Sequence, residues 1–174
     1  MLVESLQIKD QETLVDYLRS GWQLSLSVAI DFTGSNGDPQ EPTSLHRLDG
    51  CNQYEQAIMS ITSILEHYDD NKCFPIWGFG GIPKFMGDSE PNHCFPLNGD
   101  RANPEVQGAQ AILEMYRKNI LGIQLSGPTY FAEILNEMIK IVKSQLSKPI
   151  YHILLILTDG EIHDMTATID IIVN

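Results

Sequence analysis

The sequence has little positive charge. Its 174 residues include 11 lysines and arginines against 23 aspartates and glutamates, which gives a formal net charge of -12. A chain this acidic repels the phosphates of nucleic acids and the headgroups of anionic lipids unless a cation lies between them. We therefore predict no nucleic-acid partner.

Cysteines and long apolar runs are also scarce. Cys51, Cys73 and Cys94 form an odd set without C-x-x-C spacing, so the sequence predicts buried free thiols rather than a disulfide framework or a zinc module. The longest apolar run, 153–157, is too short to span a bilayer, and the N-terminus lacks the basic start and apolar stretch of a signal peptide. We expect a soluble, intracellular chain.

The hydrophobic residues that are present suffice for one core. A chain of this length with 43% hydrophobic residues suits a single domain over 1–174. Residues 24–30 and 150–157 are apolar and end abruptly at polar turn residues, as strands of a largely buried sheet do. Residues 73–79 form a third candidate strand, in which Pro75 lacks a backbone donor and favours the margin of the sheet.

Between these strands, hydrophobic residues recur with helical spacing on two clear faces and on a weaker one over 106–116. The two clear faces consist of Tyr54, Ala57, Ile58, Ile61, Ile64, Leu65 and Tyr68, and of Phe131, Ile134, Leu135, Met138, Ile141 and Val142. Strands alternating with such helices predict an α/β fold with an open, mostly parallel sheet flanked by helices. Residues 80–103 read as a long loop with one short edge strand at 93–97. A last helix begins near Asp164 with no strand after it, so we expect the domain to be truncated at its C-terminal side.

Two of the predicted strands end in an aspartate, Asp31 and Asp159. Because ligands collect at the carboxyl edge of parallel strands, we expect the two carboxylates to share one site. The hydroxyls of Thr33 and Ser35 follow on a glycine-containing turn, and Thr129 follows a Gly-Pro turn where a helix is predicted to start. These hard oxygen donors suit one Mg²⁺ or Mn²⁺ ion better than zinc or copper.

Each of these features alone has an ordinary structural explanation. Serine and threonine in turns often cap helices, and an aspartate at a strand end often accepts a hydrogen bond from a nearby amide. A haloacid-dehalogenase-type phosphotransferase is an alternative, with Asp31 as the nucleophile and Asp159 and Asp164 near magnesium. Thr33 stands where that class needs an acidic proton donor, so we predict that the chain is not an enzyme.

The histidines and the glycine-rich stretch at 78–81 favour structural roles. No Lys-Ser/Thr follows the glycines, which predicts a tight turn after a strand rather than a phosphate loop. The histidines are dispersed through predicted loops, helix ends and a strand, which favours packing or surface positions over metal binding. They are His46, His67, His93, His152 and His163.

The motifs at the predicted site resemble those of a known family. Asp31-Phe-Thr-Gly-Ser35 resembles the D-x-[ST]-x-S opening of the metal-ion-dependent adhesion site of von Willebrand factor A domains. Gly127-Pro-Thr129 resembles its threonine loop, and Thr158-Asp159-Gly160 its closing aspartate. From about Leu14 to the end, the strings VAIDFTGSNGDP, TSLH, HYD, GFG, FPLNG, QLSGPT and LLILTDGEIHDM are similar to the A domains of copines.

This resemblance implies a von Willebrand A fold, which is Rossmann-like, and a mode of metal binding. Thr33, Ser35 and Thr129 would contact the cation directly, while Asp31 and Asp159 would act largely through bound water. So little anionic charge in direct contact would leave the ion able to bind a carboxylate from a partner protein.

Two positions depart from the copine pattern. Tyr130 stands where copines commonly have asparagine, and Glu161 where an apolar residue is usual, which leaves partner specificity open. Full-length copines bind phospholipid in a calcium-dependent way through two C2 domains, and neither is visible in this chain. For the longer protein, the resemblance implies a cytoplasmic location with calcium-dependent association with the plasma membrane.

Overall fold

The structure, a computed structural model, describes residues 11–69 and 71–173. Its helices are α1 (Leu14–Arg19), α2 (Gln53–Leu65), α3 (Ala109–Asn119), α4 (Ala132–Ser144) and α5 (Met165–Val173). Its strands are β1 (Gln23–Asp31), β2 (Cys73–Phe79), β3 (Gly81–Pro83), β4 (Phe95–Pro96), β5 (Glu105–Gln107), β6 (Ile123–Leu125) and β7 (Ile150–Leu157). The 3-10 turns are η1 (Gly34–Asn36), η2 (Glu66–Tyr68), η3 (Lys84–Met86) and η4 (Ile120–Gly122).

The three longest strands form a parallel sheet. β1 lies between β2 and β7, with Val28 opposite both Ile76 and Leu155. β4 and β5 pair antiparallel with β2, and β3 and β6 form a small antiparallel sheet of their own. The predicted α/β fold with an open, mostly parallel sheet flanked by helices is confirmed.

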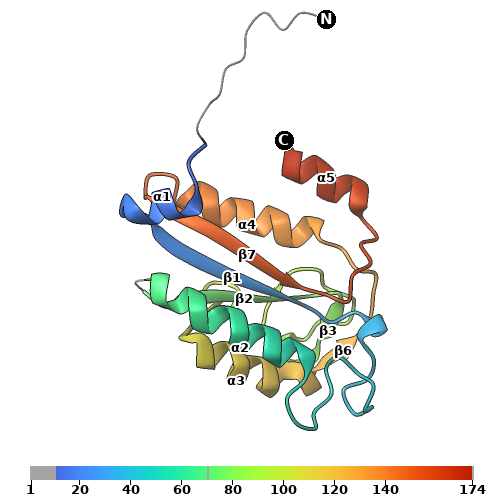
Figure 1. The fold of residues 1–174 in the computed structure, drawn as a ribbon. Helices are drawn as coiled ribbons and strands as arrows, with labels where there is room; N and C mark the ends of the chain where they lie inside the picture. The colour runs from blue at the N-terminus through green and yellow to red at the C-terminus, as the bar shows by residue number, and fades with distance from the viewer. Residues whose placement is uncertain (1–10, 70, 174) are drawn as a thin grey trace, which may run out of the picture.

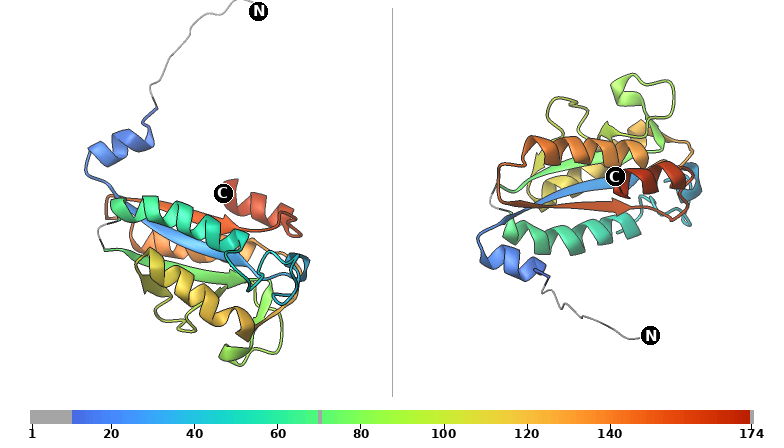
Figure 2. Two further views of the ribbon diagram at one scale, coloured as in Figure 1. Left: turned by 60° about the horizontal axis from the view of Figure 1, so that its bottom comes forward. Right: turned by 90° about the horizontal axis from the view of Figure 1, so that it is seen from above.

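Helices cover both faces of this sheet. α2 and α3 pack side by side on one face, and α4 lies on the other with α5 beside it (Figure 1). The turned views show the same layers (Figure 2). β1, β2 and β7 run toward the same end of the molecule, where the loops after β1 and β7 meet. This end is the carboxyl edge at which the sequence predicts a site.

The side chains of β1 alternate between two cores. Leu26, Val28 and Ile30 point into the core beneath α2 and α3, whereas Ala29 belongs to the core beneath α4. Because helices cover both faces, Val28, Ala29 and Ile30 follow one another without a polar residue between them, whereas Ser25 and Ser27 alternate with leucines earlier in the strand. The apolar run before Asp31 is what makes the strand recognisable in the sequence.

β2 lies inside the sheet between β1 and the short strands β4 and β5, but its Pro75 end pairs on one side only, as the missing donor predicts. Pro75 lies opposite Glu105 of β5, and the pairing with β1 begins only at Ile76. Proline is accommodated because only one neighbouring strand pairs at this position. The predicted edge strand within 93–97 is β4, at one end of the sheet.

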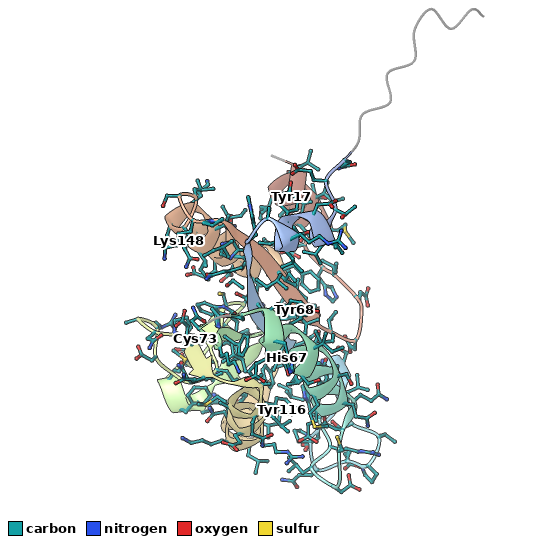
Figure 3. All side chains as sticks on the ribbon, turned by 60° about the vertical axis from the view of Figure 1, so that its left-hand side comes forward. Tyr17, His67, Tyr68, Cys73, Tyr116 and Lys148 are labelled. Carbon is teal, nitrogen blue, oxygen red and sulfur yellow. The ribbon has the colours of Figure 1, made fainter. Side chains whose placement is uncertain are left out.

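The buried face of α2 differs from the predicted one. Tyr54 and Ile58 are buried as expected, but Ile64 is 63% exposed and Tyr68 is 50% exposed. Tyr68 lies in the turn η2 beyond the end of α2 (Figure 3). Thr62 is fully buried instead, and its hydroxyl donates to the carbonyl oxygen of Ile58 at 2.6 Å. This bond inside the helix allows a polar side chain to occupy the apolar face.

α3 and α4 begin later than predicted. Val106 lies in β5, and α3 starts at Ala109 after Gly108, whose φ of 86° suits glycine. α4 starts at Ala132, so Thr129 precedes the helix rather than starting it. The first amides of α4 bond to the distant Asp164, so no neighbouring residue marks its start.

The cysteines are free, as predicted. All three are half-buried, which corrects the expectation of buried thiols. Cys94 packs against the core beneath α4, and Cys51 lies just before α2.

Two isoleucines of α2 offer a matched test of this packing. Ile58→Ala removes a fully buried side chain and should lower the free energy of unfolding by about 2–5 kcal/mol. Ile64→Ala removes a largely exposed side chain and should change the free energy of unfolding by less than about 1 kcal/mol. Urea denaturation followed by circular dichroism measures both. Equal losses in the two variants would contradict the orientation of α2.

Candidate functional site

The loops at the carboxyl edge of the sheet enclose an open pocket. Four of the five predicted site residues line it, and the fifth, Asp31, ends β1 and is fully buried. The lining residues are Thr33, Ser35, Ser126, Gly127, Pro128, Thr129, Asp159, Glu161 and His163. The folded chain therefore brings the predicted oxygen donors together from three separate segments.

Both carboxylate oxygens of Asp31 accept hydrogen bonds. The backbone N–H of Thr33 donates to Oδ1 at 2.8 Å, and the hydroxyl of Thr158 donates to Oδ2 at 2.7 Å. Burial raises the pKa of Asp31, and the nearby charge of Asp159 acts in the same direction. The two hydrogen bonds only partly offset burial, so the Asp31 carboxylate is a group that a nearby cation would stabilise. Sequence reasoning did not identify Thr158 as its partner.

The turn η1 positions the first two hydroxyls. Thr33 Oγ1 and Ser35 Oγ are 3.0 Å apart, and Asn36 Nδ2 donates to both the side-chain and backbone oxygens of Thr33, each at 3.2 Å. Gly34 N–H donates to the carbonyl of Ser126, and this bond ties the turn to the segment that leads to Thr129. Thr33 Oγ1 can donate to Ser35 and accept from Asn36 while one lone pair stays free.

Gly80 lies directly behind Thr33. Its φ of 76° favours glycine, and a Cβ at this position would collide with the methyl group of Thr33. The glycines predicted to form a tight turn after β2 thus also leave room for Thr33 in the site.

Two residues after β7 hold the threonine loop. Thr129 N–H donates to Nδ1 of His163 at 3.2 Å, and His163 N–H donates back to the carbonyl of Thr129 at 2.9 Å. The carboxylate of Asp164 accepts from Phe131 N–H at 3.0 Å and from Ala132 N–H at 2.9 Å. Asp164 therefore caps α4, as carboxylates do at helix starts. The carboxylate of Asp164 therefore bonds to the start of α4 and is not free to bind magnesium, as the phosphotransferase alternative would require.

Asp159 contributes an exposed carboxylate to the pocket. It follows Thr158, whose hydroxyl both donates to Asp31 and accepts from Gly160 N–H at 3.2 Å. One short turn after β7 thereby links the two predicted aspartates.

Beneath the site lies a buried hydrogen-bonded layer that sequence reasoning missed. His46 is fully buried between the rings of Phe32 and Tyr54, which stack on it at 5.2 and 4.4 Å between ring centroids. His46 Nε2 lies 2.8 Å from the carbonyl oxygen of Asp31, and Nδ1 lies 2.7 Å from the hydroxyl of Tyr116. The isolated His46 in a predicted loop gave no sign of this role.

The protonation of His46 follows from these partners. A carbonyl can only accept, so Nε2 donates to Asp31 and Nδ1 accepts from the Tyr116 hydroxyl. Asn52 Nδ2 in turn donates to the Tyr116 oxygen at 3.1 Å. Burial lowers the pKa of His46 to about 4, which keeps the ring neutral. This chain of bonds fixes the backbone of Asp31 from below.

A second chain of bonds supports Thr33. The Tyr54 hydroxyl donates to Oδ1 of the buried Asn36, whose Nδ2 contacts Thr33 as described above. α2 begins at Gln53 behind the N-cap Asn52, and its first residues therefore support both Asp31 and Thr33.

The oxygen donors decide what the pocket can bind. Within residues 11–69 and 71–173, no three His, Cys, Asp or Glu side chains are grouped so that they could hold a metal ion. A cation in this pocket would instead depend on the hydroxyls of Thr33, Ser35 and Thr129, with Asp31 and Asp159 nearby. Such neutral and anionic oxygens fit Mg²⁺ or Mn²⁺.

Comparison with known proteins identifies the family. The sequence model described as Copine matches residues 44–174, which is most of the chain. The chain belongs to the copine family. Protein BONZAI 1 of Arabidopsis thaliana is 42% identical over 167 residues, and Protein BONZAI 2 of the same plant is 41% identical over 169 residues. The alignments cover 93% and 94% of this copine chain and 28% of each relative, so the chain spans less than a third of these relatives.

The family match covers only part of the site. Thr129 and Asp159 lie within the matched residues, whereas Asp31, Thr33 and Ser35 precede residue 44. The grouping of the five residues at one edge therefore rests on the local geometry. In the part of this copine chain that the structure describes, no helix is long and apolar enough to cross a membrane.

The buried histidine makes a pH-dependent prediction. The pKa of His46 is about 4 in the folded chain instead of 6.5, so between these pH values the ring is protonated in the unfolded chain and neutral in the folded one. Lowering the pH through this range therefore favours the unfolded chain. The free energy of unfolding should therefore fall between about pH 7 and about pH 4 in metal-free buffer. The fall should be on the order of 3 kcal/mol larger for the wild type than for His46→Gln, which has no ring to protonate. Urea titrations at several pH values measure this, and a pH-independent difference between the two proteins would contradict a neutral buried ring.

Proposed function

We propose that this copine domain binds one Mg²⁺ or Mn²⁺ ion in the hydroxyl-lined pocket and, through it, an acidic residue of a partner protein. The observation that carries the proposal is the convergence of Thr33, Ser35 and Thr129 beside the buried Asp31. Three hydroxyls from two separate loops meet at one carboxyl edge of the sheet. A shared ligand explains this convergence better than helix capping does. In the described structure, Thr129 caps no helix.

The residues of the pocket divide the work of holding a cation. Thr33, Ser35 and Thr129 would offer neutral oxygens, while Asp31 and Asp159 supply negative charge close behind them. When bound, the cation would supply a positive charge that is incompletely neutralised and attracts an outside carboxylate. A neutral hydroxyl from a partner would lack this charge attraction.

The two departures from the copine pattern lie around this pocket. Glu161 lines it and adds a carboxylate to that of Asp159. Tyr130 follows Thr129 and packs at a tilt against His93, with 4.6 Å between the ring centroids. Extra negative charge at Glu161 would strengthen attraction for the cation and weaken attraction for an acidic partner, so it bears on partner choice.

The proposal describes a binding domain rather than an enzyme. Phospholipid binding, a cytoplasmic location and calcium-dependent association with the plasma membrane are proposed only for a longer copine that carries C2 domains. The phosphotransferase alternative gains nothing from the site, because Thr33 lacks an acidic proton and Asp164 caps α4.

Metal binding should be visible as thermal stabilisation. The hydroxyls converge only in the folded chain, so millimolar Mg²⁺ or Mn²⁺ should raise the melting temperature, and calcium should raise it less. Differential scanning fluorimetry after EDTA treatment measures the shift. No shift with any divalent ion, or a much larger shift with calcium, would contradict the proposed site.

Asp31→Asn is the matched control for this experiment. The amide keeps the size of the side chain and removes a charge whose burial is unfavourable. We expect the metal-free variant to melt at or above the temperature of the wild type and to lose the metal-induced shift. A variant that keeps the full shift would show that the cation binds elsewhere.

The isolated chain should not bind anionic membranes. Its net charge of -12 repels phosphatidylserine, and a calcium-dependent membrane contact is proposed only for the C2 domains of longer copines. Co-sedimentation with phosphatidylserine vesicles over a rising calcium series tests this, with phosphatidylcholine vesicles as the neutral comparison. Calcium-dependent sedimentation with phosphatidylserine alone would contradict the prediction.

A further inference from the structure

His163 is set apart from the other residues that line the pocket. Among the nine lining residues it is the one with a nitrogen in its side chain, and two others, Asp159 and Glu161, are carboxylates. A partner carboxylate entering the pocket would meet these negative charges. It therefore needs a donor other than the hydroxyls that would hold the cation.

The hydrogen bonds of His163 fix where its proton lies. The N–H of Thr129 can only donate, so Nδ1 of His163 accepts, and the neutral ring carries its proton on Nε2. Nε2 is on the side of the ring away from Thr129, and the side chain is exposed where it lines the pocket. The structure gives Nε2 no hydrogen-bond partner among the described residues.

Three backbone donors near Thr129 are already in use. Thr129 N–H bonds to His163, and Phe131 and Ala132 N–H bond to Asp164. The N–H groups of Phe131 and Ala132 are therefore not available to an incoming anion. The Nε2–H of His163 is a side-chain nitrogen donor left for a ligand beside them.

We propose that the Nε2–H of His163 hydrogen-bonds the partner's carboxylate, with one carboxylate oxygen on the cation and the other on His163. This inference rests on the proposed function and adds a residue to it. It makes His163 a specificity-determining residue, because a planar carboxylate has two oxygens and a hydroxyl or amide partner cannot satisfy both contacts with negative charge. It also offsets the repulsion from Glu161.

Two substitutions separate the two nitrogens of the ring. His163→Asn places an amide oxygen near the position of Nδ1, where it can accept from Thr129 N–H, and leaves no donor at the position of Nε2. His163→Gln reaches as far as Nε2 and can present an N–H there. His67→Asn is the matched control, because His67 lies at the far end of α2 from the pocket (Figure 3).

The probe is acetate, titrated into the Mg²⁺-loaded chain and followed by amide nitrogen NMR, with Mg²⁺ affinity measured separately by calorimetry. We expect His163→Asn to bind Mg²⁺ as the wild type does. It should bind acetate about tenfold more weakly, because the loss of one hydrogen bond to a charged group lowers affinity by about this factor. His163→Gln should bind acetate within about twofold of wild type, and His67→Asn should equal wild type.

Several outcomes would overturn the proposal. Unchanged acetate affinity in His163→Asn would refute the contact between His163 and the carboxylate but not the metal site. Loss of Mg²⁺ binding in that variant would mean that His163 only supports the position of Thr129. If the wild-type chain binds no Mg²⁺, or binds acetate equally well without Mg²⁺, both the proposed function and the contact between His163 and the carboxylate are refuted. If the variants fail to fold, the test is the NMR resonance of Nε2 of His163 in the wild-type chain. Acetate should shift this resonance in the presence of Mg²⁺, and an unchanged resonance would contradict the proposal.

Discussion

The burial of the Asp31 carboxylate is the constraint on which the site depends. A charged group in the interior is unfavourable unless hydrogen bonds or an opposite charge surround it. Thr33 N–H and the Thr158 hydroxyl supply the hydrogen bonds, and both come from turns at the carboxyl edge. The turns after β1 and β7 are therefore drawn to one point. A cation at this point would offset the part of the unfavourable burial of the Asp31 charge that the two hydrogen bonds do not offset.

The layer beneath Asp31 explains how the turns keep their shape. His46 bonds to the carbonyl oxygen of Asp31 and is itself bonded by Tyr116, while Asn36 bonds to Thr33 and is itself bonded by Tyr54. These aromatic rings pack against one another inside the core, so their polar atoms have little freedom to move. The start of α2 and the middle of α3 thus act on the pocket without lining it.

The loop that carries Thr129 is held by the segment that follows β7. His163 and Asp164 bond to the backbone of this loop and to the first turn of α4. One stretch of sequence therefore supplies the closing Asp159, the clamp on Thr129 and the cap of α4. A movement of this stretch would change the position of a carboxylate and a hydroxyl together, which couples α4 and α5 to the pocket.

The sequence by itself determined the strands β1 and β7, the presence of helices at α2 and α4, and the choice of five candidate oxygen donors, because local hydrophobic period and strand-ending polar residues are short-range signals. Tertiary structure decided the rest. The buried Thr62 in place of Ile64, the cap of α4 by Asp164, and the roles of His46, Asn36 and Thr158 all depend on partners that are distant in the sequence. No local pattern encodes such partners, since a buried polar atom takes whichever donor or acceptor the packed fold brings within reach.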